Sequence, residues 1–162
     1  MENKSKRSVE RVRDFFAQRG EDITIKELDA STRTAQLAAD AVGAPLGSIV
    51  KSLVFIAGER AILALVAGDQ RADPVKIAQC VGATRAQIAN AEQVRAQTSY
   101  AIGGVPPVAH PAQLDTLVDQ SLARFEKIWA AAGAPNALFE IEFQKLLELA
   151  QGRVADIVVA NK

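Results

Sequence analysis

The chain has 162 residues, of which 49% are hydrophobic and 23% are charged, so it fits one globular domain rather than a disordered or low-complexity chain. Nineteen basic residues balance nineteen acidic ones, so overall charge alone does not make this chain a binder of long nucleic acid. A local basic patch on its surface remains compatible with this balance. The single cysteine, Cys80, excludes an intramolecular disulfide and a multi-cysteine zinc site, and the single histidine excludes a histidine cluster. We therefore expect no metal and no other cofactor.

The N-terminal end is polar, and residues 1–7 include Lys4, Lys6 and Arg7. We expect these seven residues to form a flexible tail on a single domain that spans residues 1–162. The first thirty residues lack an apolar signal-peptide core, and no apolar run approaches the ~18 residues of a membrane span. These features predict a soluble cytoplasmic protein.

The first predicted helix begins at Ser8 as N-cap and ends at Gly20, with Val9, Val12 and Phe16 on one face. The patterns that follow predict, in chain order, a strand over 23–28, a helix from Ser31 or Thr32 to about Val42, strands over 49–57 and 61–67 joined as a hairpin, and helices over 74–81 and 91–97 capped by Asp73 and Asn90.

A loop over residues 98–111 separates this half from the remainder. The remainder is predicted to contain strands near 114–118 and 127–131, a strand over 137–143, a helix over 144–150 and a last strand near 154–159. Because strands and helices interleave around a central hairpin, the expected fold is α/β of the mixed α+β kind, with a mixed sheet rather than a purely doubly wound one.

Lys51 interrupts an otherwise apolar strand and, by period-two alternation, shares a face with Ile49, Leu53 and Phe55. An ammonium among apolar neighbours costs free energy unless it reaches water, an anion or a carboxylate. Two interpretations remain open. Lys51 reaches solvent from the strand end, or it stands on a pocket wall and faces a carbonyl or phosphate oxygen.

The segment Gly103-Gly104-Val105-Pro106-Pro107 breaks the pattern a second time. Two glycines allow close approach to the backbone and leave N–H donors available, and two prolines stiffen the following turn. An ordinary turn between strands is the alternative, because no phosphate-loop or dinucleotide motif accompanies the glycines.

Other single polar and aromatic residues have plainer interpretations. His110 is expected to be structural or solvent-facing, and Cys80 to be a small buried hydrophobe. Asp69, Arg71 and Asp73 are expected to be turn and cap residues, with a pocket role as the alternative. Trp129 and Tyr100 are expected to pack in the interior.

These two breaks carry a family resemblance. The stretch from Gly47 to Phe55, with Lys51 inside it, resembles the lysine-bearing strand of the YbaK/EbsC family, the editing domains associated with prolyl-tRNA synthetase. Residues 102–107 resemble that family's Gly-x-x-x-Pro loop, and the segments 29–34 and 153–156 are also similar. The resemblance extends from about Ser8 to Asp156.

The resemblance implies a compact domain with a strongly curved, barrel-like mixed sheet and surrounding helices. It also implies hydrolysis of the ester of mischarged tRNA, typically tRNA for proline carrying a wrong small amino acid. Lys51, Gly103 and Gly104 would be catalytic, with the two glycine N–H groups holding an oxyanion. The residues expected to bind the substrate are Thr34, Ser52, Pro106, Pro107 and Ala131.

The implied partners are the 3′ end of an aminoacyl-tRNA and prolyl-tRNA synthetase, with no membrane, and both a monomer and a homodimer remain open. Two departures from the family pattern qualify the resemblance. Ala109 stands where glycine is usual, and Ala131 stands where cysteine-type deacylases carry serine, which favours a small aliphatic group over cysteine. The alternative functions are a non-catalytic nucleic-acid-binding or regulatory module and a small-molecule hydrolase or binding protein on the same scaffold.

Overall fold

The structure, a computed structural model, describes residues 2–29, 32 and 34–160. The helices are α1 (Glu2–Gln18), α2 (Ala35–Val42), α3 (Pro74–Cys80), α4 (Ala91–Thr98) and α5 (Phe143–Ala150), with short 3-10 turns η1 (Leu46–Ser48) and η2 (Gln120–Arg124). The strands are β1 (Ile25–Glu27), β2 (Val50–Ala57), β3 (Arg60–Ala67), β4 (Ala86–Ile88), β5 (Asp115–Asp119), β6 (Lys127–Ala131), β7 (Ala137–Glu142) and β8 (Arg153–Ala155). None of the helices described is both long enough and apolar enough to cross a membrane.

The strands form two open sheets rather than a closed barrel. The larger sheet has the order β4-β2-β3-β5-β8 and the smaller one the order β1-β7-β6. The β2–β3 hairpin is antiparallel, whereas β5 runs parallel to β3, so the larger sheet is mixed as predicted. An isolated bridge between Ile49 and Trp129 joins the two sheets where β2 begins. The chain is a single mixed α/β domain, as the sequence predicts.

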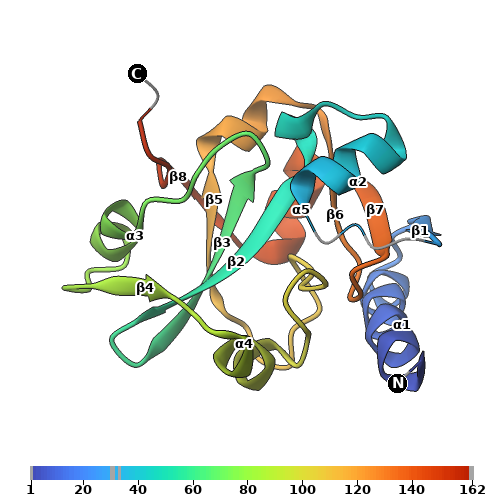
Figure 1. Cartoon of the computed structure of the whole chain (residues 1–162), viewed down its shortest axis with the longest axis horizontal. Helices are drawn as coiled ribbons and strands as arrows, with labels where there is room; N and C mark the ends of the chain where they lie inside the picture. Colours follow the sequence, from blue (N-terminus) through green and yellow to red (C-terminus); the bar gives the residue numbers. More distant parts are fainter. Residues whose placement is uncertain (1, 30–31, 33, 161–162) are drawn as a thin grey trace.

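The main hydrophobic core lies between the two sheets, and α1 closes it (Figure 1). Val9, Val12 and Phe16 are each at most 2% exposed, which confirms the predicted buried face of this helix. Ile62 to Ala67 of β3 are all buried, as expected for a central strand covered on both sides. β2 is only half-buried over residues 51–53, and this departure from the prediction marks the site described below.

Both ends of the chain differ from the prediction. The first helix begins at Glu2, so the predicted N-cap at Ser8 is wrong, and residues 2–7 of the predicted tail are helical. Lysine, arginine and glutamate favour helix, and the buried Ser8 lies inside the helix. The last strand ends at Ala155, and Val158 forms only an isolated bridge to Ala72 instead of continuing the strand to residue 159.

Smaller corrections concern caps and short elements. The N-cap of α2 is Thr34 rather than Thr32, whose hydroxyl donates instead to the Pro135 carbonyl oxygen at 2.8 Å; Ser31 lies outside the described residues. The three-residue strand β4 is absent from the prediction because it is too short for an alternating pattern. Cys80 is half-buried rather than buried.

Candidate functional site

A cavity of about 330 Å³ opens beside the first half of β2. Residues 49–54 form one wall, and α2, the end of β4, α4, the loop after α4 and the strands β6 and β7 supply the remaining described lining. In Figure 1, α2 and the loop after α4 lie along the same side of β2. Most lining side chains are aliphatic, and the volume is at the low end of small-molecule sites. The cavity therefore suits a small, largely apolar group.

The cavity brings together five of the eight site residues that the sequence predicts. Lys51, Ser52, Thr34, Gly103 and Ala131 all line it, although they lie up to 97 positions apart in the chain. The described lining does not include Gly104, Pro106 or Pro107, which lie buried behind the cavity-facing part of the loop. Five of the predicted residues therefore line the cavity, and the other three lie in the buried part of the loop behind it.

The backbone of β2 is open toward the cavity at Ser52. β4 pairs only with Phe55, Ile56 and Ala57, and the bridge at Ile49 lies at the other end of the strand. Along a β-strand, the backbone N–H and C=O groups of alternate residues point to the same side. The Val54 carbonyl points away from β3, because it accepts a hydrogen bond from the Ala89 N–H at 2.9 Å. The backbone groups of Ser52, two residues earlier, therefore also point away from β3. The Ser52 hydroxyl oxygen is also buried without a hydrogen-bond partner among the described residues. Together with Lys51, this group supplies a polar anchor on a largely apolar wall.

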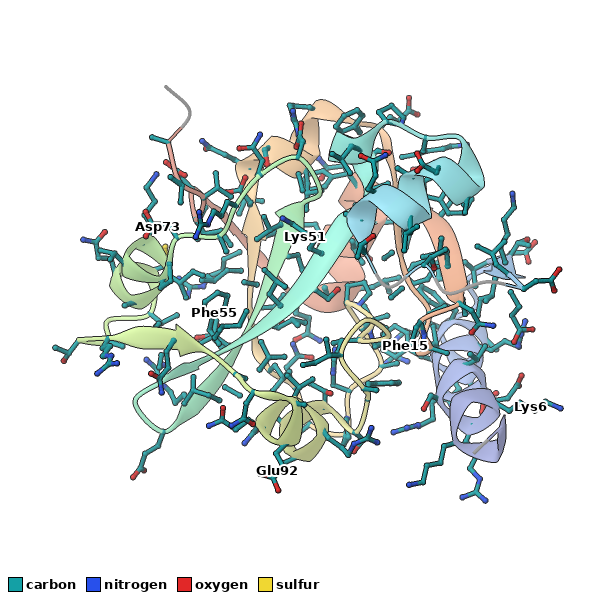
Figure 2. The ribbon with its side chains drawn as sticks, in the orientation of Figure 1. Lys6, Phe15, Lys51, Phe55, Asp73 and Glu92 are labelled. Carbon is teal, nitrogen blue, oxygen red and sulfur yellow. The ribbon has the colours of Figure 1, made fainter. Side chains whose placement is uncertain are left out.

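Lys51 is half-buried, and its Nζ donates a hydrogen bond to the Gln70 carbonyl oxygen. An ammonium has three N–H donors, so this bond orients the group while leaving donors for a ligand. Burial lowers the pKa of Lys51, and the nearby Asp69 carboxylate opposes that shift. Of the two interpretations open from the sequence, the structure favours a cation on the cavity wall, shown centrally in Figure 2.

Asp69 belongs to an ion pair that the sequence analysis missed. Its carboxylate accepts two hydrogen bonds from Arg124, at 2.7 and 3.0 Å, which hold the pKa of Asp69 below its ordinary value. A Cβ at Gly47 would lie 2.8 Å from an Arg124 guanidinium nitrogen and 2.9 Å from an Asp69 oxygen, so glycine makes room for the pair. Gly47, at the start of the lysine motif, was the sequence feature that could have indicated this ion pair. The reason for a glycine there becomes visible only when Asp69 and Arg124, which are distant in sequence, are placed beside it.

The glycine loop offers one backbone donor where two were expected. Gly103 lines the cavity with φ of +90°, a conformation that favours glycine, and its N–H has no hydrogen-bond partner among the described residues. The Gly104 N–H donates to the Ala101 carbonyl oxygen at 2.9 Å within the turn. A Cβ at Gly104 would also lie 2.9 to 3.0 Å from the Ala134 backbone. Gly104 therefore supports the loop, and of the two glycines only Gly103 keeps an N–H beside the cavity that is unpaired within the described chain.

The lone histidine braces this loop from behind. His110 Nε2 donates to the Pro106 carbonyl oxygen at 2.8 Å, and the ring packs edge-to-face against Tyr100 at 5.7 Å. The Tyr100 hydroxyl donates to the Ala109 carbonyl oxygen at 2.7 Å. Ala109 adopts φ of +67°, a left-handed conformation that favours glycine, the residue that the family resemblance led us to expect there. His110 and Tyr100 are structural, as the sequence predicts, and Asp73 is likewise the N-cap of α3.

Comparisons with known proteins point to one family of proteins. A model of the aminoacyl-tRNA editing domain matches residues 29–149. An uncharacterised Bacillus subtilis protein, YwhH, is 32% identical over 148 residues, which cover 91% of this chain and 94% of the relative. EbsC of Enterococcus faecalis, named as a candidate Cys-tRNA(Pro)/Cys-tRNA(Cys) deacylase, is 26% identical over 76% of each chain. A crystal structure described as a candidate trans-editing enzyme for prolyl tRNA synthetase superimposes with a TM-score of 0.89 at 44% identity, covering 94% of this chain and 98% of that one.

Proposed function

The chain belongs to the aminoacyl-tRNA editing domain family, and on that premise we propose that it hydrolyses the ester of mischarged tRNA in trans. The proposed substrate is tRNA for proline that carries a wrong small amino acid, and the proposed place of action is the cytoplasm. The observation that carries the proposal is the meeting of Lys51, Ser52 and Gly103 on the walls of one small apolar cavity. The solved relative described for prolyl tRNA synthetase supports that synthetase as a partner.

The chemistry of the ester supports this use of the cavity. Water attacks the carbonyl carbon, the bond from that carbon to the ribose oxygen breaks, and a proton passes to the ribose oxygen, releasing free amino acid and tRNA. In this proposal, the Gly103 N–H binds the oxyanion and the Lys51 ammonium holds a carbonyl or phosphate oxygen of the 3′ end. The described cavity lining contains no histidine or carboxylate, which supports activation of water by the vicinal hydroxyl of the tRNA.

A separate editing cavity is needed because an aminoacylation site cannot exclude amino acids that are similar in size to the correct one. Proline and alanine differ too little for an aminoacylation pocket to separate them strongly by binding alone. Ala131, Ala35 and Ala38 line the cavity with methyl groups, so they favour an aliphatic side chain such as that of alanine or 2-aminobutyrate. The lining thus supports a small aliphatic group over cysteine.

Hydrolysis of a panel of aminoacylated tRNAs tests both the activity and its selectivity. We expect alanyl-tRNA and 2-aminobutyryl-tRNA for proline to be hydrolysed at least ten-fold faster than the cysteinyl form, about 1.4 kcal/mol of discrimination, with the prolyl form spared. A clear preference for cysteine would contradict the assigned selectivity. Equal hydrolysis of simple aminoacyl esters would favour a small-molecule hydrolase, and tRNA binding without turnover would favour a non-catalytic module.

The pH dependence should report the state of Lys51. Because its pKa is lowered from 10.5 by burial, the ammonium loses its proton at a lower pH than an ordinary lysine does. We therefore expect kcat/KM, corrected for spontaneous hydrolysis, to fall on the alkaline side below pH 10.5. Asp69→Asn removes the charge that opposes the shift and should move this limb to lower pH.

The matched control for that experiment is Asp156→Asn, because Asp156 pairs with Lys76 at 3.0 Å and lies outside the described cavity lining. It should leave the alkaline limb where it is in the unmodified protein. A limb that moves equally in both variants, or in neither, would contradict the electrostatic link between Asp69 and Lys51.

A further inference from the structure

We propose that Lys4, Arg7, Arg11 and Arg95 form a phosphate-binding stripe that takes the duplex backbone of an RNA whose 3′ end enters the cavity. This inference rests on the proposed function, because it assigns a surface to the RNA part of the substrate. It goes beyond the matched family model, whose first residue is 29 and which therefore does not include α1.

The stripe follows from the helical period. Positions 4, 7 and 11 recur at three and four residues, so their side chains share one flank of α1. All three side chains are exposed, whereas Val9, Val12 and Phe16 turn into the core. Positions 4 to 11 span about 10 Å along the helix axis at 1.5 Å per residue, which allows contact with more than one phosphate.

This flank faces the loop that lines the cavity. Arg11 donates to the Ser99 carbonyl oxygen at 3.1 Å and lies over the Tyr100 ring at 4.6 Å. Arg95, exposed in the last turn of α4, accepts the Ser99 N–H through its own carbonyl at 2.8 Å. In Figure 2, Phe15, one turn beyond Arg11, lies on the inner side of α1, and Lys6 points away from the molecule. Arg11 and Arg95 thus both adjoin the Ser99–Tyr100 segment, and Gly103 of the cavity wall lies three residues after Tyr100 in the chain.

Charge distinguishes this flank from the opposite one. Arg13, on the other side of α1, is neutralised by Glu10 at 3.1 Å and faces Glu27 at 3.9 Å. Across the described residues, no carboxylate within 4 Å pairs with any of the four stripe cations. Other described cations, among them Arg71, Arg85 and Lys127, also form no ion pair, so helical spacing and the contacts of Arg11 with Ser99 and Tyr100 single out this flank rather than charge balance alone.

Helix stability does not account for this arrangement. Cations in the first turns of a helix oppose the macrodipole, which favours carboxylates there. Lys4 and Arg7 therefore sit at a weakly unfavourable place for folding. Duplex RNA, by contrast, presents a dense row of phosphates, and separated cations on a helix position such a backbone without reading its sequence. A polyanion is the partner that this flank fits.

The test uses an RNA hairpin with a single-stranded CCA 3′ end that carries no amino acid, so binding is measured without turnover. The variant Lys4→Gln/Arg7→Gln/Arg95→Gln keeps Arg11 on Tyr100 and removes three charges. We expect at least ten-fold weaker binding by fluorescence anisotropy and a slope of log affinity against log salt that is smaller by about 2. The control Lys6→Gln/Arg13→Gln/Lys26→Gln removes as many charges elsewhere and should leave the slope unchanged.

A second measurement separates this inference from the proposed function. The stripe variant should raise KM for an aminoacylated hairpin, while hydrolysis of an aminoacyl-adenosine that lacks the stem should match the unmodified protein. Hairpin binding equal to that of the control variant, or a loss without a change in salt slope, would overturn the stripe. Normal RNA binding with lost binding to prolyl-tRNA synthetase would overturn it in favour of a protein partner. Hairpin binding through the stripe without any ester hydrolysis would instead refute the proposed function alone.

Discussion

Lys51→Ala is expected to reduce deacylation to a small residual rate while leaving the fold intact. The ammonium is half-buried on the cavity wall, where removal of one oriented donor to a developing charge costs about 10²-fold to 10³-fold in turnover. Its Nζ donates to the Gln70 carbonyl oxygen, so the substitution leaves no buried carboxylate without a partner. Single-turnover hydrolysis of alanyl-tRNA for proline measures the loss.

The control for this experiment is Lys76→Ala. Lys76 also donates to a backbone carbonyl oxygen, that of Val158 at 2.8 Å, but it lies on α3 outside the described cavity lining. It should keep full turnover, and circular dichroism of both variants should match the unmodified protein. Undiminished turnover in Lys51→Ala would refute the role of this lysine, and so would an equal loss in the Lys76 variant.

Gly133→Ala is expected to lower the free energy of unfolding by about 3 kcal/mol. Gly133 has φ of +99°, which strains any side chain, and an added Cβ would lie 2.5 Å from the Ser8 carbonyl oxygen of α1. Both atoms are held by backbone, so α1 must shift to relieve the overlap. Urea denaturation followed by circular dichroism measures the change.

Gly20→Ala separates the two causes. Gly20 has a comparable positive φ of +68°, but nothing lies within 4 Å of its added Cβ. Its cost should be about 1 kcal/mol, from backbone strain alone. Equal losses at both glycines would show that the close approach of α1 to the turn after β6 contributes nothing to stability.

Local rules predicted much of the secondary structure. Asp73 and Asn90 cap their helices as expected, and Gly43 ends α2 with φ of +66°. These predictions succeed because a cap depends on residues within one turn of the chain. Local pattern placed the start of α1 wrongly at Ser8, which is buried inside that helix, and it gave no signal for the short strand β4.

The mixed α/β class, Lys51 and the glycine loop could all be inferred before the structure, because alternating elements, a charge inside an apolar strand and paired glycines are visible in short segments. The surroundings of these features became visible in the folded chain. The fold brought Thr34, Lys51 and Ala131 to one cavity and left the Gly103 N–H available while using that of Gly104 in a turn. It also paired Asp69 with Arg124 across 55 positions of sequence. Each of these outcomes depends on which distant backbone segments pack together, and that is set by the joint burial of two sheets and α1 rather than by any local pattern.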